Sequence, residues 1–143
     1  MSLENLLRVG RLKAHAADPA EIARLLTAAQ RALRDASVPT LSSDSRLELA
    51  YLALTQSALA ALRANGYRPA TSEPGHHQLV LQVLPKTIGL APRRVPVLDA
   101  YRKARNQADY HGVPVSDAVA GECVEAARRL LGEVRAWLDA RRS

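Results

Sequence analysis

The chain has 143 residues, a length that favours one domain, and Ala and Leu supply most of its 48% hydrophobic content. Both are strong helix formers, and only 3% of the residues are aromatic, so the composition argues against an all-β domain. High apolar content with well-mixed charges argues against disorder. The net charge of +6 suits an acidic partner such as RNA, and the single cysteine, Cys123, excludes an intrachain disulfide and a multi-cysteine metal site.

The first two expected helices cover residues 3–36. Apolar residues recur at helical spacing from Leu3 to Ala16, which predicts a first helix there. Asp18 and Pro19 are typical of a helix start, and Glu21 is placed to reach back to the cap. The second helix is expected to end near Ala36, before a Val-Pro pair.

A cluster of capping residues at 42–45 opens the third predicted helix. This helix is apolar around much of its circumference as far as Asn65, which predicts a central, buried position. Gly66 follows it, where a left-handed glycine commonly ends a helix.

The second half of the chain alternates loops and helices. Residues 67–75 and 89–96 are predicted to be loops, and residues 76–84 to be a short helix. Pro96 opens a helix to about Tyr110, and Ser116 or Asp117 caps a last helix to about Ala140, in which Cys123 is expected to be buried. The sequence therefore predicts an all-α, up-and-down bundle of five to six helices in a single domain, residues 1–143, without a sheet.

Several classes of function lack the motifs they require. The sequence contains no Walker loop, GxGxxG, HExxH or GxSxG pattern, so neither a cofactor nor a metal is expected. The first fifteen residues lack the apolar run of a signal peptide, and no apolar stretch approaches the length of a membrane span. We therefore expect a soluble, cytoplasmic protein with no membrane partner.

The segment from Arg102 to Gly112 holds the first group of candidate site residues. On a helix, small and apolar side chains would form an inward stripe of Val97, Tyr101, Ala104 and Ala108. Arg105 then lies at one edge of this stripe and His111 near the other, about 120° away. The small residues would let a second copy of the helix approach, which would bring Arg105 and His111 of two chains into one groove.

A histidine beside an arginine suits metal-independent RNA cleavage. An imidazole exchanges protons near neutral pH, and a guanidinium can stabilise the charge that develops on a phosphate. Simpler interpretations stay open, because Arg105 and Asp109 have the i,i+4 spacing of an ion pair. His111 is also placed to interact with the C-terminal end of the helix dipole.

Two adjacent histidines, His76 and His77, form a second candidate site at a helix start. Backbone N–H groups at such a position can bind an anion, so a phosphate site is one interpretation and a polar helix start is the other. Adjacent helical residues point 100° apart, so the two are not expected to share a metal ion.

The string RKARNQADYHG, residues 102–112, lies between an apolar helix and a long Ala/Leu/Arg helix and resembles the HEPN family, most closely a bacterial type with an RNxADYH pattern. The likeness covers residues 42–140, with the helices of residues 3–36 packed on that core. Arg105 and Asn106, followed after four further residues by His111, match the family's arginine–polar residue–histidine hallmark. In HEPN toxins the histidine more often comes one residue earlier, where this chain has Tyr110.

The resemblance implies a metal-independent endoribonuclease that acts as a homodimer, as a toxin or defence component of a toxin–antitoxin type. Arg105 and His111 would then be catalytic, with Arg102, Asn106, Asp109 and Tyr110 in support or in contact with RNA. One alternative is a non-catalytic helical module that binds RNA or a protein partner such as a minimal nucleotidyltransferase. Another is a helical dimer with no role in RNA chemistry.

Overall fold

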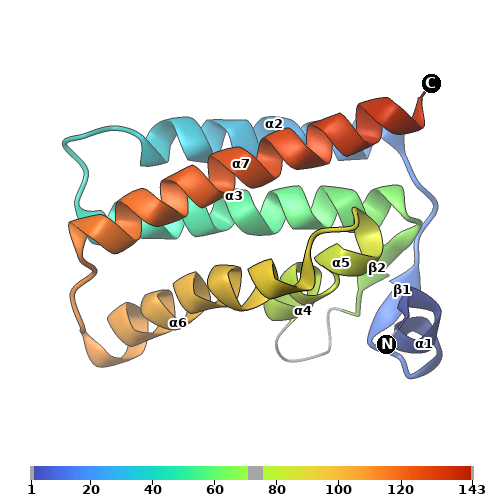
Figure 1. Ribbon diagram of the computed structural model, residues 1–143, viewed down its shortest axis with the longest axis horizontal. Helices are drawn as coiled ribbons and strands as arrows, with labels where there is room; N and C mark the ends of the chain where they lie inside the picture. Colours follow the sequence, from blue (N-terminus) through green and yellow to red (C-terminus); the bar gives the residue numbers. More distant parts are fainter. Residues whose placement is uncertain (1, 71–75, 143) are drawn as a thin grey trace.

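The computed structural model describes residues 2–70 and 76–142, and three long helices form its body (Figure 1). Helix α3 (Ser43–Ala64) lies in the middle, with α2 (Pro19–Ala36) and α7 (Asp117–Arg141) packed on one side. Helix α6 (Val95–His111) and the short helices α4 (His76–Gln82) and α5 (Leu84–Thr87) lie on the other. The predicted all-α helical bundle is confirmed.

The central position of α3 follows from its many small and apolar side chains. Half of its 22 residues are buried, and alanines at 50, 53, 58 and 61 are completely so. Small side chains let α2 and α7 approach the α3 backbone closely, while Leu47, Leu54 and Leu62 fill the space between the helices. The sequence prediction of a central, buried helix is therefore confirmed.

Local capping explains where the long helices begin and end. Asp18 accepts a hydrogen bond from the Ala20 N–H at 3.0 Å, and Ser42 accepts one from the Ser45 N–H at 3.1 Å. Ser116 caps α7 through the Val119 N–H at 3.1 Å. Gly112 ends α6 with φ of +65°, a conformation that glycine adopts without strain.

The prediction of one helix over residues 3–16 is wrong. Helix α1 (Leu3–Arg8) ends at a turn where Gly10 has φ of +82°, and the chain then forms strand β1 (Leu12–Ala14). β1 pairs antiparallel with β2 (Tyr67–Pro69), so the prediction that the protein has no sheet is also wrong. β2 occupies part of the predicted loop at 67–75, and residues 71–75 of that loop lie outside the described part. The pairing buries Leu12 completely, and this burial outweighs the helical periodicity.

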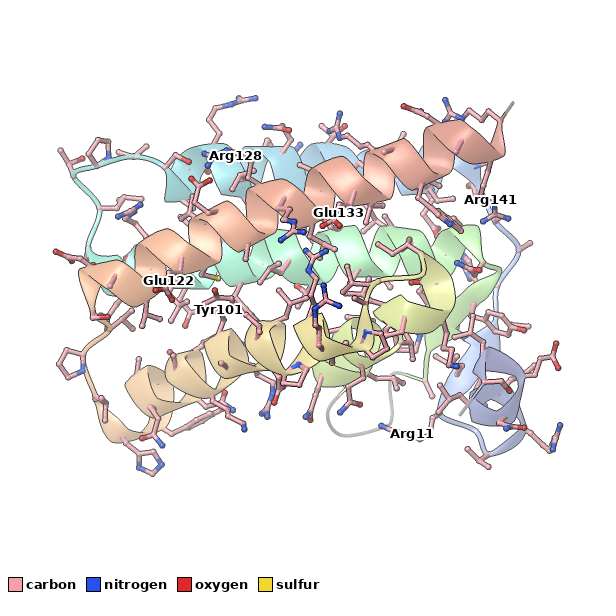
Figure 2. All side chains as sticks on the ribbon, in the orientation of Figure 1. Arg11, Tyr101, Glu122, Arg128, Glu133 and Arg141 are labelled. Atoms are coloured by element: carbon pink, nitrogen blue, oxygen red, sulfur yellow. The ribbon has the colours of Figure 1, made fainter. Side chains whose placement is uncertain are left out.

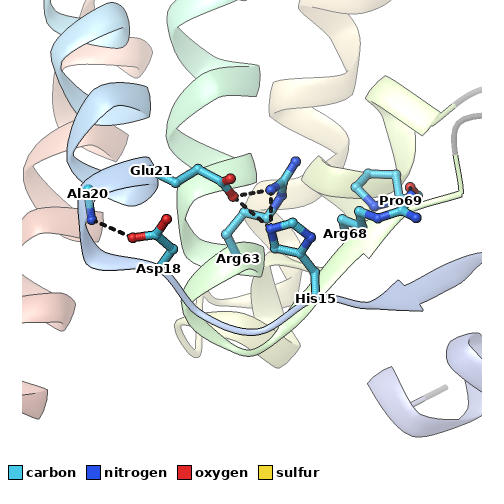
Figure 3. Close-up of polar contacts among 7 residues, drawn as sticks. All are labelled: His15, Asp18, Ala20, Glu21, Arg63, Arg68 and Pro69. Atoms are coloured by element: carbon cyan, nitrogen blue, oxygen red, sulfur yellow. Dashed lines mark hydrogen bonds and ion pairs between the residues drawn. The ribbon is translucent and has the colours of Figure 1, made fainter.

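The position of Glu21 predicts that its side chain reaches back to cap α2, and this prediction is wrong. Its carboxylate instead binds His15 and Arg63, and so joins the segment after β1 to the end of α3 (Figure 3). This contact attaches residues 2–15, which we call the N-terminal arm, to the bundle.

The predicted short helix at 76–84 is present as α4, which ends at Gln82, two residues early. The predicted loop at 89–96 contains a 3₁₀ turn, η1 (Pro92–Arg94), and α6 starts directly after it. Arg94 donates two hydrogen bonds to Glu133 of α7, at 2.6 and 2.8 Å, which anchors the start of α6 to α7.

Helix α6 presents a somewhat different face to the bundle from the one expected. Tyr101 is buried, as predicted (Figure 2), and Leu98, which the prediction did not place inward, is buried as well. Val97 is 56% exposed, so its predicted inward orientation is wrong. Because Tyr101 stays inward while Leu98 replaces Val97, the buried face is shifted toward Leu98 by part of the roughly 100° between neighbouring residues. Ala104 and Ala108 are only half-buried.

Two small polar side chains, Cys123 and Ser57, are fully buried in the core. Cys123 is fully buried, as predicted, and burial raises the pKa of its thiol to about 12. The hydroxyl of Ser57 is also fully buried and has no hydrogen-bond partner among the described residues.

Replacing Ser57 by alanine should therefore stabilise the protein by about 1 kcal/mol, because an unpaired buried hydroxyl is removed and alanine favours the helix. Chemical denaturation of both proteins measures the difference. Ser42→Ala on the same helix is the matched control and should destabilise by about 1 kcal/mol, because it removes a cap. A loss of stability in Ser57→Ala would show that the hydroxyl has a partner.

Candidate functional site

Arg105 lies on the side of α6 that faces α3. Its Nε–H donates a hydrogen bond to the Glu48 carboxylate at 2.9 Å, and its guanidinium carbon lies 5.3 Å from the ring centroid of Tyr51. Both partners come from the second and third turns of α3, so the packing of α6 on α3 positions the guanidinium. The side chain keeps 35% of its surface exposed, which leaves it accessible to a ligand.

A second carboxylate lies near the same nitrogen of this guanidinium. The Asp109 oxygen lies 3.7 Å from Arg105 Nε, as the i,i+4 spacing predicted. Glu48 and Asp109 are therefore close to each other as well. Burial, followed by a hydrogen bond with Asp109, raises the pKa of Glu48, while Arg105 acts in the opposite direction.

Arg102 is directed elsewhere. It forms a two-point contact with Asp99, at 2.6 and 3.2 Å, on the same helix. This hydrogen bonding lowers the pKa of Asp99 below its usual range. Arg102 is therefore held by a local ion pair on α6 and does not contact Glu48 or Asp109 among the described ion pairs.

The remaining predicted residues of this segment lie along the end of α6. Tyr110 is 78% exposed, His111 is exposed as the last residue of the helix, and Asn106 is half-buried. Among the contacts of the described residues, none joins His111 to Arg105. One chain therefore does not bring the two predicted catalytic residues together.

The structure instead places Arg105 in one pocket with a residue of the second candidate site. A pocket of about 210 Å³ between α3, α4 and α6 is lined by Glu48, Leu49, Tyr51, Leu52, Thr55, His77 and Arg105. His77 lies at the start of α4, while the side chain of its neighbour His76 lies outside the described part of the structure. The sequence did not predict that His77 and Arg105 meet, because no short-range spacing connects them.

Tyr51 is a site residue that the sequence did not single out. Its side chain is 3% exposed, and its hydroxyl has no hydrogen-bond partner within the described ranges. Burial raises its pKa to about 12, so the group is a neutral phenol that can donate a hydrogen bond. Its neighbours in the sequence are leucines and alanines, which are typical of a buried helix, so the local pattern did not distinguish Tyr51 from an ordinary core residue.

The described part of the chain forms neither a metal centre nor a membrane span. Within residues 2–70 and 76–142, no group of three or more histidine, cysteine, aspartate or glutamate side chains is arranged to hold a metal ion. No described helix is both long and apolar enough to cross a bilayer.

Comparisons with known proteins give no relative. No protein-family model, no curated protein and no solved structure matches this chain.

Proposed function

We propose that this chain is a HEPN-type endoribonuclease that works as a homodimer and needs no metal ion. The observation that carries the proposal is the position of Arg105, whose guanidinium is fixed against Tyr51 at the edge of a pocket and still exposed. A fixed, accessible guanidinium suits a phosphate, because its planar set of donors matches phosphate oxygens.

The dimer follows from how little of α6 is covered. All 17 residues of this helix are described, and two of them, Leu98 and Tyr101, are buried. Its outer surface and the turn after it expose Val97, Tyr110 and Val113, while Asp99, Arg102, Lys103 and Asp109 place charges of both signs along it. A second copy related by a two-fold axis would cover the apolar side chains and match the charges, since such an interface is self-complementary.

The same pairing would complete the site. Within one helix, Arg105 and His111 are separated by six residues, about 9 Å along the axis, and point in different directions. Antiparallel packing of two copies of α6 brings the His111 end of one helix toward the middle of the other. The active site then combines Arg105 of one chain with His111 of its mate.

The proposed reaction is an internal transfer at the RNA backbone. His111 takes the proton of a ribose 2′-hydroxyl, the oxygen attacks the adjacent phosphorus, and the bond from phosphorus to the 5′-oxygen breaks. The leaving oxygen takes up a proton, and a 2′,3′-cyclic phosphate remains. Arg105 stabilises the additional negative charge on the phosphate oxygens, and Asn106 and Tyr110 are placed on the same helix end to contact the RNA.

A second candidate function is a non-catalytic module that binds RNA or a protein such as a minimal nucleotidyltransferase. The contact of Arg105 with both Glu48 and Asp109 favours the protein-binding form of this module, because two carboxylates offset the positive charge that an RNA phosphate would need. The RNase proposal requires the phosphate to compete with these carboxylates.

The test is incubation of the purified chain with labelled RNA in excess EDTA. We expect cleavage to 2′,3′-cyclic ends by the natural sequence and none by the Arg105→Ala, His111→Ala double variant. Arg128→Ala is the matched control, because it removes a positive charge from an exposed position of α7, and it should cleave RNA normally. Absence of cleavage by a well-folded dimer would support the binding module, and cleavage that survives in the double variant would show that other residues act.

The dimer itself is expected at micromolar concentration. Light scattering should give twice the 15.5 kDa of one chain. Val97→Asp combined with Tyr110→Asp should shift the protein to the monomer, because charges would enter an apolar interface, while Val38→Asp, at a similarly exposed position between α2 and α3, should not. A mass of one chain for the natural sequence would contradict the proposed arrangement.

A further inference from the structure

The pocket beside Arg105 offers more space than a phosphate contact uses. It has a volume of about 210 Å³, and Leu49 and Leu52 of α3 are among its lining residues. Leu52 is 44% exposed, so part of this apolar lining is open to a ligand. The volume lies below the range of about 300–1,000 Å³ that is usual for drug-sized ligands, so the pocket suits a single small ring system.

The outer edge of the Arg105 guanidinium is free to bind a phosphate. Both of its carboxylate contacts are made by Nε, with Glu48 at 2.9 Å and with Asp109 at 3.7 Å. The two Nη atoms form no hydrogen bond or ion pair with a described residue, and they are not among the polar atoms enclosed by the protein. Four of the five guanidinium donors therefore remain available while Glu48 holds Nε.

The carboxylate of Glu48 is a second accessible polar group of this pocket. Its side chain keeps 42% of its surface exposed, and it lines the pocket together with Leu52. A carboxylate offers about four acceptor positions, and the hydrogen bonds with Arg105 and Asp109 occupy two of them. A ring that lies on Leu52 and carries N–H donors can therefore bind the remaining positions.

We propose that this pocket holds a base of the bound RNA and that Glu48 makes the site select guanine. The inference rests on the proposed function, because the base belongs to the RNA whose phosphate Arg105 binds. Guanine carries two adjacent N–H donors on its Watson–Crick edge, at N1 and at the N2 amino group, which match a carboxylate. Uracil places its one N–H between two carbonyl oxygens, which a carboxylate repels. The ring packs on Leu49 and Leu52.

Titration calorimetry of mononucleotides on the full chain in EDTA tests the proposal without any cleavable bond between nucleotides. We expect guanosine monophosphate to bind with one-to-one stoichiometry. Inosine monophosphate lacks only the N2 amino group and should bind about tenfold more weakly, because one hydrogen bond to Glu48 is lost. Uridine monophosphate should bind more weakly still. Guanosine, without the phosphate, should bind more weakly than its monophosphate, because the contact with Arg105 is missing.

Two variants separate the contributions of the carboxylate and the guanidinium. Glu48→Gln should remove most of the preference for guanosine over inosine monophosphate, because an amide presents only one acceptor oxygen. The same variant should bind uridine monophosphate at least as tightly as the natural sequence, since a negative charge beside Arg105 is lost. Arg105→Ala should bring guanosine monophosphate to the affinity of guanosine. Arg93→Gln, at an exposed arginine outside the pocket, is the matched control and should change nothing.

A blocking variant separates binding in the pocket from binding elsewhere on the chain. Leu52→Trp fills the pocket from an exposed position and should abolish selective binding, whereas Leu41→Trp, at an exposed position outside the pocket, should bind as the natural sequence does. Equal affinity for the guanosine and uridine monophosphates, an unchanged preference in Glu48→Gln, unchanged binding in Leu52→Trp, or no heat at millimolar guanosine monophosphate would each overturn the proposal.

The base site and the cleavage reaction can fail separately. Selective binding of guanosine monophosphate by a chain that cleaves no RNA would support the base site and count against the nuclease. Cleavage of RNA in EDTA without any base selectivity in binding would support the nuclease and overturn the base site.

Discussion

Replacing His111 by alanine should slow metal-independent RNA cleavage by about 10²- to 10⁴-fold, because a positioned proton-transfer group usually contributes that much to the rate. Arg105→Ala should lose roughly 3–4 kcal/mol of transition-state stabilisation, by analogy with the loss of an oxyanion donor. Arg105→Lys should recover little, because an ammonium cannot reproduce the planar contact with phosphate. Single-turnover rates on labelled RNA in EDTA measure all three.

Subunit mixing gives this prediction its sharpest control. If each site combines two chains, mixing Arg105→Ala with His111→Ala protein should restore one intact site in each mixed dimer. Activity should then rise toward a quarter of the natural level, since about half of randomly formed dimers are mixed and each has one of two sites. A mixture as inactive as its components would contradict an active site shared between chains.

Replacing Leu54 by alanine should lower the free energy of unfolding by about 2–5 kcal/mol. Leu54 is completely buried in the middle of α3, and its loss removes hydrophobic contact and leaves a cavity between helices that cannot close fully. Such a loss is a large fraction of the stability of a typical domain. Urea denaturation followed by circular dichroism gives the value.

Leu52→Ala, two positions away on α3, is the matched control. Leu52 is 44% exposed, so the same change in chemistry should cost less than about 1 kcal/mol. Equal losses for both variants would mean that α3 is not the buried centre of the bundle.

The helices could be predicted because their signals are local. Asp18, Ser42 and Ser116 each cap the helix that follows them, and Gly112 ends α6 where the sequence placed the stop. The small sheet could not, because three-residue strands are too short to show a period of two. Its formation depends on Leu12 meeting Pro69, a contact between distant segments.

In the candidate site, too, the local contact could be predicted and the long-range contacts could not. The Arg105–Asp109 pair was foreseen from its i,i+4 spacing, and it lies at 3.7 Å. Arg105 lies beside Glu48 and Tyr51 of α3 and shares a pocket with His77 of α4. The residues around position 105 in the sequence give no indication of these neighbours. The exposure of Val97 could not be predicted from the residues of α6 alone, because the contact that anchors the start of this helix, Arg94 with Glu133, joins residues 39 positions apart.

The pairing of β1 with β2 joins segments that lie far apart in the sequence. Helices α2 and α3 meet across a short turn, whereas Ala14 and Tyr67 lie on either side of both helices. Long loops close slowly relative to short ones, so we expect the N-terminal arm to join a preformed α2–α3 hairpin late in folding. The arm contributes two buried side chains to the core, Leu6 and Leu12. We therefore expect it to be the segment that opens while the rest of the bundle stays folded.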